Sequence, residues 1–100
     1  MGAFEAPGLG LRYFMIKVLL FGELEELAGT REVSMPGTRV LEVLTALASL
    51  YGKEFRDIVL GGTGENGIII LVNNAPVRHN VFETPLADGD VVSLMPLFDA

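Results

Sequence analysis

Apolar residues occur in runs of strand length at three places along the chain. The first run, residues 15–21, contains β-branched residues and stops at Gly22. The second covers residues 68–72, and the third covers residues 91–96 close to the end of the sequence. Runs of this length and composition predict three strands that are buried on at least one face.

One helix is predicted between the first and second strands. It follows Thr38, a good N-cap residue, and ends at Gly52, which offers a C-terminal stop. Residues 23–28 predict a short helical turn, and residues 54–60 predict a second one. The apolar residues that recur at the spacing of one helical face are Val40, Leu41, Val43, Leu44, Leu47, Ala48 and Tyr51.

Two shorter stretches predict edge strands. Residues 31–35 alternate and stop at Pro36, which is consistent with an edge strand antiparallel to the first strand. Residues 73–76 predict a turn, since asparagine tolerates the left-handed backbone conformation, and residues 77–78 predict a brief edge strand after it. The order of elements therefore indicates an α+β domain in which one main helix crosses one sheet.

Alternation within the long strands leaves apolar side chains on both faces of this sheet. One helix covers only one face, so we expect a patch on the other face that binds a protein partner. The alternative is that short loops or the N-terminal residues fold over this patch. The residues predicted to form it are Leu19, Phe21, Leu71, Val91 and Met95.

Length and composition predict one compact domain, because half of the 100 residues are hydrophobic. We expect residues 15–100 to form this domain and residues 1–14 to be a loose extension, which has no secretory-signal pattern. No apolar run reaches the roughly 18 residues that a membrane-spanning helix needs. The expected protein is soluble and cytoplasmic, without a membrane partner.

Composition also restricts the chemistry. The chain has no cysteine, which excludes disulfides, thiolate metal sites and cysteine nucleophiles. Its net charge of −6 comes without a basic patch, so we expect no nucleic-acid partner and favour a basic surface on a protein partner. His79 is the only histidine and has neither a catalytic triad nor a metal-ligand set around it in the sequence. We therefore expect a surface role for His79, and no metal or cofactor.

Three further motifs have structural interpretations. Residues 62–67 fit the letters of a dinucleotide-binding loop, but that mechanism needs a helix after the glycines, and a strand follows here. Asp88 and Asp90 flank Gly89, a turn signal, so we assign them to a turn and not to acid–base chemistry. Three glutamates are expected to form a solvated helical face: Glu23, Glu25 and Glu26.

The turn at residues 87–90 and the strand after it resemble the end of the ubiquitin-like sulfur carriers of the MoaD/ThiS family. Pro96 stands where the family's Pro-Pro-x-x-Gly-Gly motif begins. Residues 21–29 are similar to the family's opening Phe-x-x-x-Arg-Glu-Leu-x-Gly, and residues 70–73 resemble its Val-Asn-Gly turn, with Asn74 in the place of the glycine. The resemblance implies the β-grasp fold of ubiquitin, with a mixed sheet of four to five strands packed on one main helix. In that fold the first and last strands pair in parallel at the centre.

The resemblance also implies a chemistry for the C-terminus. In these carriers an E1-like enzyme adenylates the terminal glycine carboxylate with ATP, and sulfur then replaces AMP to give a thiocarboxylate. Here Asp99 and Ala100 stand at the end of the sequence, so the carboxylate of Ala100 is the candidate reactive terminus. Phe98 adds bulk and Asp99 adds a negative charge, so we expect a poor sulfur donor.

Three functions follow as hypotheses. The first is a non-enzymatic module that docks on enzymes of molybdenum or tungsten cofactor biosynthesis or of related sulfur transfer. The second is an active sulfur carrier whose Ala100 is adenylated and thiocarboxylated. The third is an enzyme in its own right, and only the motif at residues 62–67, which we interpret as a loop, would support it.

The partners implied by the resemblance are an E1-like adenylyltransferase, a protein like the large subunit of molybdopterin synthase, or both. A homodimer is a further possibility, and the pathway stays open among molybdopterin, thiamine and tRNA thiolation. The residues expected to bind the partner are Leu19, Phe21, Leu71, Val91, Met95, Pro96, Leu97, Phe98, Asp99 and Ala100.

Overall fold

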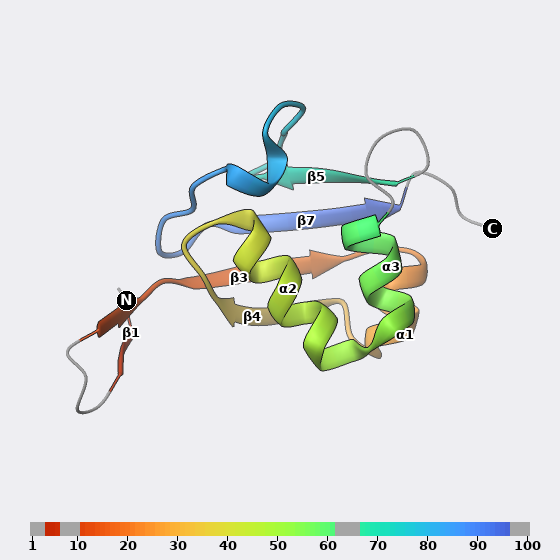
Figure 1. The fold of residues 1–100 in the computed structure, drawn as a ribbon, viewed down its shortest axis with the longest axis horizontal. Coiled ribbons are helices and arrows are strands. Elements are labelled where there is room, and N and C mark those ends of the chain that lie inside the picture. The colour runs from red at the N-terminus through yellow and green to blue at the C-terminus, as the bar shows by residue number, and fades with distance from the viewer. Residues whose placement is uncertain (1–3, 7–10, 62–66, 97–100) are drawn as a thin grey trace.

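Five strands form the main sheet of the computed structural model, which describes residues 4–6, 11–61 and 67–96 (Figure 1). The first and last long strands of the chain lie next to each other and run parallel. The three remaining pairs of neighbouring strands run antiparallel. The predicted parallel pairing of the first and last long strands at the centre of a mixed sheet is therefore confirmed. Across the sheet, the strands are β4 (Glu32–Pro36), β3 (Met15–Leu20), β7 (Val91–Pro96), β5 (Ile68–Val72) and β6 (Ala75–Pro76).

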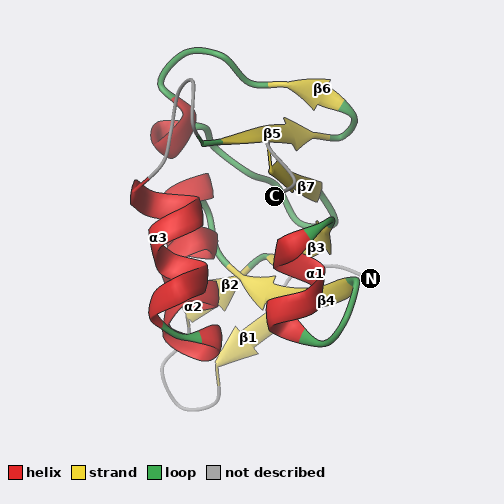
Figure 2. Ribbon diagram, turned by 90° about the vertical axis from the view of Figure 1, so that its right-hand side faces the viewer, coloured by secondary structure: helices red, strands yellow, loops and turns green. Residues whose placement is uncertain are grey.

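Three helices occur in the described residues: α1 (Glu23–Ala28), α2 (Val40–Tyr51) and α3 (Lys53–Gly61). Figure 2 shows α2 and α3 on the same side of the sheet. The bounds of α1 are those predicted, whereas α3 is a nine-residue helix and not a short turn. Because α3 buries Phe55 and Val59 completely, it adds to the core beside the main helix α2.

The core lies between the sheet and the helices. Each central strand contributes alternate side chains to it, as the period of a strand requires. The helices add their apolar faces, and the rings of Tyr51 and Phe55 meet with centroids 5.2 Å apart. The completely buried apolar residues of the described chain are Ile16, Val18, Leu20, Leu24, Val40, Val43, Leu44, Leu47, Phe55, Val59, Val92 and Leu94.

The start of α2 differs from the prediction by one residue. Arg39, with extended backbone angles, is the N-cap, and its side chain makes no capping hydrogen bond. Thr38 precedes it and donates both its backbone N–H (2.7 Å) and its hydroxyl (2.9 Å) to Glu42 Oε1. The expected N-cap role of Thr38 is therefore wrong, because its hydroxyl acts as a donor to Glu42 and not as an acceptor of a helix N–H.

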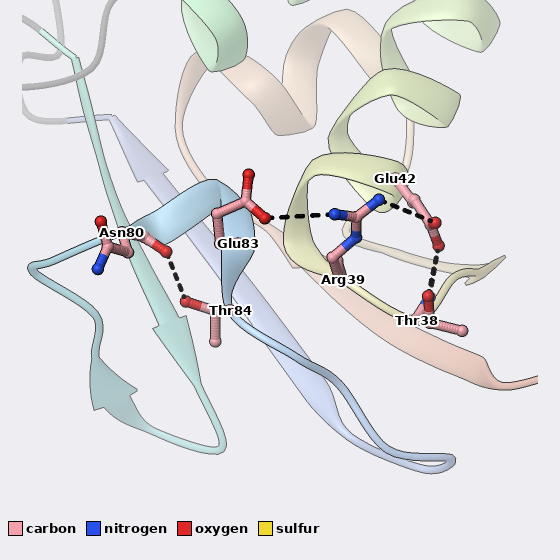
Figure 3. A network of polar contacts seen from close by, with 6 residues as sticks. All are labelled: Thr38, Arg39, Glu42, Asn80, Glu83 and Thr84. Carbon is pink, nitrogen blue, oxygen red and sulfur yellow. Dashed lines mark hydrogen bonds and ion pairs between the residues drawn. The ribbon is translucent and has the colours of Figure 1, made fainter.

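Polar contacts join the start of α2 to the 3₁₀ turn η1 (Val81–Glu83), as Figure 3 shows. Arg39 lies between two carboxylates, with Nη1 3.2 Å from Glu83 Oε1 and Nη2 3.7 Å from Glu42 Oε2. The backbone N–H of Val40 also donates to the carbonyl oxygen of Thr84 (3.0 Å). Exposed ion pairs of this kind contribute little to stability individually. The backbone hydrogen bond from Val40 to Thr84 is therefore the stronger connection between α2 and η1.

The last edge strand is also shifted. It comprises Ala75–Pro76 and not residues 77–78, since Asn73 and Asn74 both have left-handed backbone angles (φ 53° and 72°). These two residues reverse the chain at once, so Ala75 lies directly opposite Val72. The left-handed conformation predicted for asparagine is confirmed, and the shorter turn moves the strand towards the N-terminus.

Residues 87–90 form the turn that was predicted before β7. Gly89 has φ 89°, and its N–H donates to the carbonyl oxygen of Met15 (3.0 Å). Asp88 Oδ1 accepts the backbone N–H of Met15 (2.9 Å), and Asp90 Oδ2 accepts that of Ala87 (2.8 Å). Both aspartates thus serve the backbone, and the turn fastens the start of β3.

Asn73 holds the start of β7 on its other side. Its Nδ2 donates to Asp90 Oδ1 (3.1 Å), and its Oδ1 accepts the backbone N–H of Val91 (3.0 Å). Its own backbone N–H donates to the carbonyl oxygen of Val91 (2.7 Å). We call this set of bonds among Asn73, Asp90 and Val91 the Asn73 clasp.

A separate two-stranded sheet lies within residues 1–14, the segment expected to be a loose extension. It pairs β1 (Phe4–Ala6) with β2 (Leu11–Tyr13) in antiparallel fashion, with Phe4 opposite Tyr13. Aromatic residues favour strands, which is consistent with this pairing. Figure 1 shows β1 and β2 past the start of β3, away from the main sheet. The division of the chain into an extension and a domain stays a prediction.

Candidate docking surface

The helices cover one face of the main sheet, and no helix of the described residues covers the other (Figure 2). Ile16 and Val18 of β3 and Val92 of β7 are completely buried on the helix side. Their sequence neighbours therefore point to the opposite side. We call this side the open face, and its central residues are Lys17, Leu19, Ile69, Leu71, Val91, Ser93 and Met95.

Register places the apolar residues of the open face in rows across the strands. Leu19 lies opposite Ser93, and Ser93 lies opposite Leu71, so the three form one row over β3, β7 and β5. Met95 lies opposite Ile69 in the next row. Directly opposed side chains on one face of a sheet contact one another, so these rows form one continuous surface.

Four of the five residues predicted for the patch lie together on this surface. Phe21 follows the end of β3 and is held by its backbone, whose N–H donates to the carbonyl oxygen of Leu94 (3.2 Å). Because Phe21 lies one residue past the end of β3 and is half-buried, the register of the strands assigns it to no row of the open face. The four residues that the structure brings together are half-buried: Leu19, Leu71, Val91 and Met95.

Besides the charged residue Lys17, two residues of the open face were missing from the predicted patch. Ile69 is 40% exposed and is thus more accessible than its neighbours on the face. Its alternation with Ile68 and Ile70, which face the core, is the signal that identifies it. Ser93 is the other, and it is only 4% exposed although it lies on this side of the sheet.

Charged residues border the open face. Lys17 Nζ lies 3.8 Å from Glu32 Oε2, and both side chains are about half exposed. At the end of the sheet, Arg31 Nη2 lies 3.4 Å from Glu25 Oε1 of α1. The glutamates of α1 were expected to form a solvated face. Only Glu26 is exposed, whereas Glu23 and Glu25 are half-buried.

The end of β7 leads from the open face towards the C-terminal residues. Pro96 is half-buried and lies opposite Ile68 at the last position of the strand. The other predicted residues of this segment lie outside the described part of the chain: Leu97, Phe98, Asp99 and the candidate reactive terminus Ala100.

The remaining candidates give no catalytic site. His79 is exposed, as expected for a surface residue. The motif at residues 62–67 follows helix α3 and precedes strand β5, the reverse of the order needed for phosphate binding, and residues 62–66 lie outside the described residues. In residues 4–6, 11–61 and 67–96, no group of three His, Cys, Asp or Glu side chains is placed to hold a metal ion. None of the helices described is both long and apolar enough to cross a membrane.

A mixed sheet with a parallel central pair and helices on one face defines a ubiquitin-like protein of the β-grasp fold. Residues 18–98 match the ThiS family, and the chain belongs to that family. The solution structure of small archaeal modifier protein 1 (SAMP1) from Methanosarcina acetivorans is 30% identical in sequence, with a TM-score of 0.74. That similarity covers 88% of this chain and 97% of SAMP1.

Two molybdopterin-converting factors are also similar. The putative subunit 1 from Pyrococcus furiosus is 28% identical over 83% of this chain and 97% of that one, with a TM-score of 0.69. A complex of subunits 1 and 2 of the factor from Helicobacter pylori contains a chain that is 25% identical, with a TM-score of 0.57. The match covers 87% of this chain and 99% of that one. A comparison with curated protein sequences gives no match.

Proposed function

We propose that this chain is a small non-enzymatic protein that docks through its open face on partner enzymes of sulfur transfer, such as those of molybdenum or tungsten cofactor biosynthesis. The observation that carries this proposal is the apolar row Leu19–Ser93–Leu71 on the face of the sheet opposite the helices. A contiguous apolar surface of this kind is typical of a protein interface. The strand at its centre, β7, leads directly into the C-terminal segment.

The comparisons support the kind of partner. Subunit 1 of the Helicobacter pylori factor forms a complex with subunit 2, which makes a subunit 2-like protein the first candidate partner of this chain. An E1-like adenylyltransferase is the second, because such an enzyme activates the sulfur carriers that the sequence resembles. A cytoplasmic location is part of the same proposal.

The C-terminal segment distinguishes a poor sulfur donor from an active carrier. In a chain that ends at Ala100, the Asp99 carboxylate lies one residue from the reacting group. Two like charges about 6 Å apart at an effective dielectric near 20 repel by roughly 3 kcal/mol before screening by salt. Because the phosphates of ATP lie near this charge during adenylation, the step should be slower by about a hundredfold.

The activity test uses the 100-residue chain, an E1-like enzyme, ATP and a sulfur source. We expect no replacement of terminal oxygen by sulfur in the intact mass, and we expect Asp99→Gly with Ala100→Gly to gain it. Efficient replacement in the unaltered chain would establish the second candidate function, an active carrier. The match of the family to residues as late as position 98 is the observation that favours that candidate.

Docking is tested with single cysteines, because the natural chain has none to interfere. Ile69→Cys reports on the open face, and Leu50→Cys is the matched control, since Leu50 is 58% exposed on helix α2. Each variant is treated with a thiol-alkylating reagent, alone and with the subunit 2-like protein or the E1-like enzyme encoded in the same genome.

We expect either partner to slow alkylation of the Ile69→Cys variant and to leave that of the Leu50→Cys variant unchanged. Equal protection of both, or of Leu50→Cys alone, would contradict docking through the open face. Protection of Ile69→Cys that grows with the concentration of the chain itself, without a partner, would assign the open face to a second copy instead.

A further inference from the structure

We propose that the groove between helices α2 and α3 is a second docking surface, which binds a short segment of a protein partner that carries acidic residues beside an aliphatic one. The groove lies on the helix side of the sheet, opposite the open face (Figure 2), so the inference goes beyond the proposed function and does not depend on it. Its volume is about 600 Å³. The side chains that line it are Thr45, Ala48, Ser49, Lys53, Arg56 and Leu60.

Gly52 forms the corner at which this groove lies. It is the one residue between α2 and α3, and its φ of 100° favours glycine because a side chain there would be strained. Its N–H donates to the carbonyl oxygen of Ala48 (2.9 Å), and its own carbonyl oxygen accepts the N–H of Arg56 (3.0 Å). The last turn of α2 and the first turn of α3 are thus fastened to the same residue, so the groove is preformed.

Two cations stand on the α3 wall of the groove, and none of the described residues that line it is acidic. Lys53 and Arg56 are three positions apart, so they lie on the same side of the helix, and both are exposed. Lys53 Nζ donates to Asp57 beside the groove (2.9 Å), whereas no ion pair of the described residues involves Arg56. A guanidinium donates two parallel hydrogen bonds to a carboxylate, which makes Arg56 the main anchor for an acidic side chain.

The rest of the groove determines the other part of the ligand. Ala48 is 8% exposed and Leu60 is half-buried, so together they offer an apolar surface to one aliphatic side chain. Thr45 and Ser49 of α2 are exposed and offer hydroxyl donors. A free phosphate would leave the apolar surface unused, and the net charge of −6 repels a long polyanion such as nucleic acid. A short acidic and aliphatic segment of a protein therefore fits the groove best.

The test titrates the isotope-labelled 100-residue chain with a blocked synthetic peptide, acetyl-Leu-Glu-Glu-Leu-Glu-amide, and follows the backbone amide signals by NMR. We expect the signals of Ser49, Lys53 and Arg56 to shift, and those of Ile69 and Leu71 on the open face to stay in place. The same peptide with glutamine in place of each glutamate should bind about tenfold more weakly or less. The proposal is overturned if the glutamine peptide binds equally well, or if no groove signal shifts at about 5 mM of the acidic peptide.

Two charge reversals separate the groove from the net charge of the chain. Arg56→Glu reverses the main anchor, and we expect it to weaken binding of the acidic peptide about tenfold. Arg78→Glu is the matched control, because Arg78 is exposed, does not line the groove and changes the net charge by the same amount. It should stay within about twofold of the natural chain. Equal losses from the two variants would contradict the groove, and circular dichroism checks that each is folded.

The other possible occupants of the groove are distinguished in the same titration. Equal shifts with inorganic phosphate would make it a general anion site. Groove signals that shift with the concentration of the chain alone would assign it to a second copy, and shifts on deletion of residues 97–100 without peptide would assign it to the chain's own end. Each of these results overturns the proposal. No enzyme partner enters this titration, so the groove and the proposed function fail separately.

Discussion

The Asn73 clasp can be tested by Asn73→Asp, which replaces the side-chain amide nitrogen with an oxygen. We predict that this variant is less stable than the natural chain and that the difference depends on pH. Asn73→Asp keeps the size of the side chain, the tolerance for a left-handed backbone and the oxygen that accepts the Val91 N–H. It replaces the Nδ2 donor, 3.1 Å from Asp90 Oδ1, with a second carboxylate oxygen. An attractive contact thereby becomes a repulsive one.

The size of the effect follows from this geometry. The lost hydrogen bond costs about 1 kcal/mol. Repulsion between two unit charges about 4 Å apart costs about 1 kcal/mol more in a water-like dielectric, the appropriate value because both groups are at the surface. We therefore expect the free energy of unfolding at pH 7 to fall by roughly 2 kcal/mol, which corresponds to a decrease in Tm of about 10 °C for a chain of this size.

The sign of the pH dependence is determined by the repulsion. Beside Asp90, the introduced carboxyl has a pKa in the folded protein above its value in the unfolded chain. The penalty is thus complete at pH values above that raised pKa and diminishes as the pH falls through it, because a protonated carboxyl can again donate to Asp90. Thermal unfolding followed by circular dichroism at pH 7 and pH 4 measures the difference.

Asn74→Asp is the matched control. Asn74 is the next residue, is exposed and also has a left-handed backbone (φ 72°), and none of the side-chain hydrogen bonds in the described residues involves it. We expect this variant to lose less than about 0.5 kcal/mol at either pH. Equal losses from the two variants, or a penalty for Asn73→Asp that persists at pH 4, would refute the role of the clasp.

Three further predictions concern helix α2, the loop before it and the end of helix α3. The backbone N–H and the hydroxyl of Thr38 donate to Glu42 and hold the pKa of that carboxyl below its ordinary value of 4.5. The ionised Glu42 therefore stabilises the folded protein above pH 4.5, and this contribution is lost as the pH falls through the lowered pKa. Glu42→Gln should therefore cost about 0.5 kcal/mol at pH 7, and less at pH 3, in urea unfolding. Gly37→Ala should cost about 1–3 kcal/mol, because its Cβ would lie 2.8 Å from Cγ2 of the buried Val43. Gly61→Ala, in open space at the end of α3, should instead stabilise by about 0.5 kcal/mol, and a loss there would contradict the argument from space.

The two faces of the sheet could be predicted from sequence because strand alternation is a local property. Ile16 and Val18 face the core as their period of two requires, and Leu19 faces the opposite side. Helix α3 was underestimated because only Phe55 and Val59 mark its buried face among charged neighbours. Its packing against α2 is a tertiary effect that a short apolar pattern does not reveal.

The depth of Ser93 could not be predicted for a related reason. A serine in a strand is ordinarily an exposed polar position, and nothing in its own neighbourhood of sequence indicates 4% exposure. Its burial comes from Leu19 and Leu71, which are 74 and 22 residues away along the chain and reach it only through the register of β3, β7 and β5. The small residue at the centre of the candidate site is thus defined by long-range pairing.

Stability and docking should respond to different residues in this fold. The row Leu19–Ser93–Leu71 spans three hydrogen-bonded strands whose opposite side chains lie in the core, so the open face is formed before any partner arrives. A preformed surface binds without the cost of ordering flexible side chains and loops, so affinity depends on the shape of that surface. Asn73→Asp should therefore lower the Tm yet bind a partner as the natural chain does at 25 °C, where it remains folded. Ile69→Asp, at a 40% exposed position of the open face, should leave the Tm nearly unchanged and weaken partner binding. If affinity instead fell in step with stability across both variants, the open face would be ordered only by binding, and the argument for a preformed surface would be wrong.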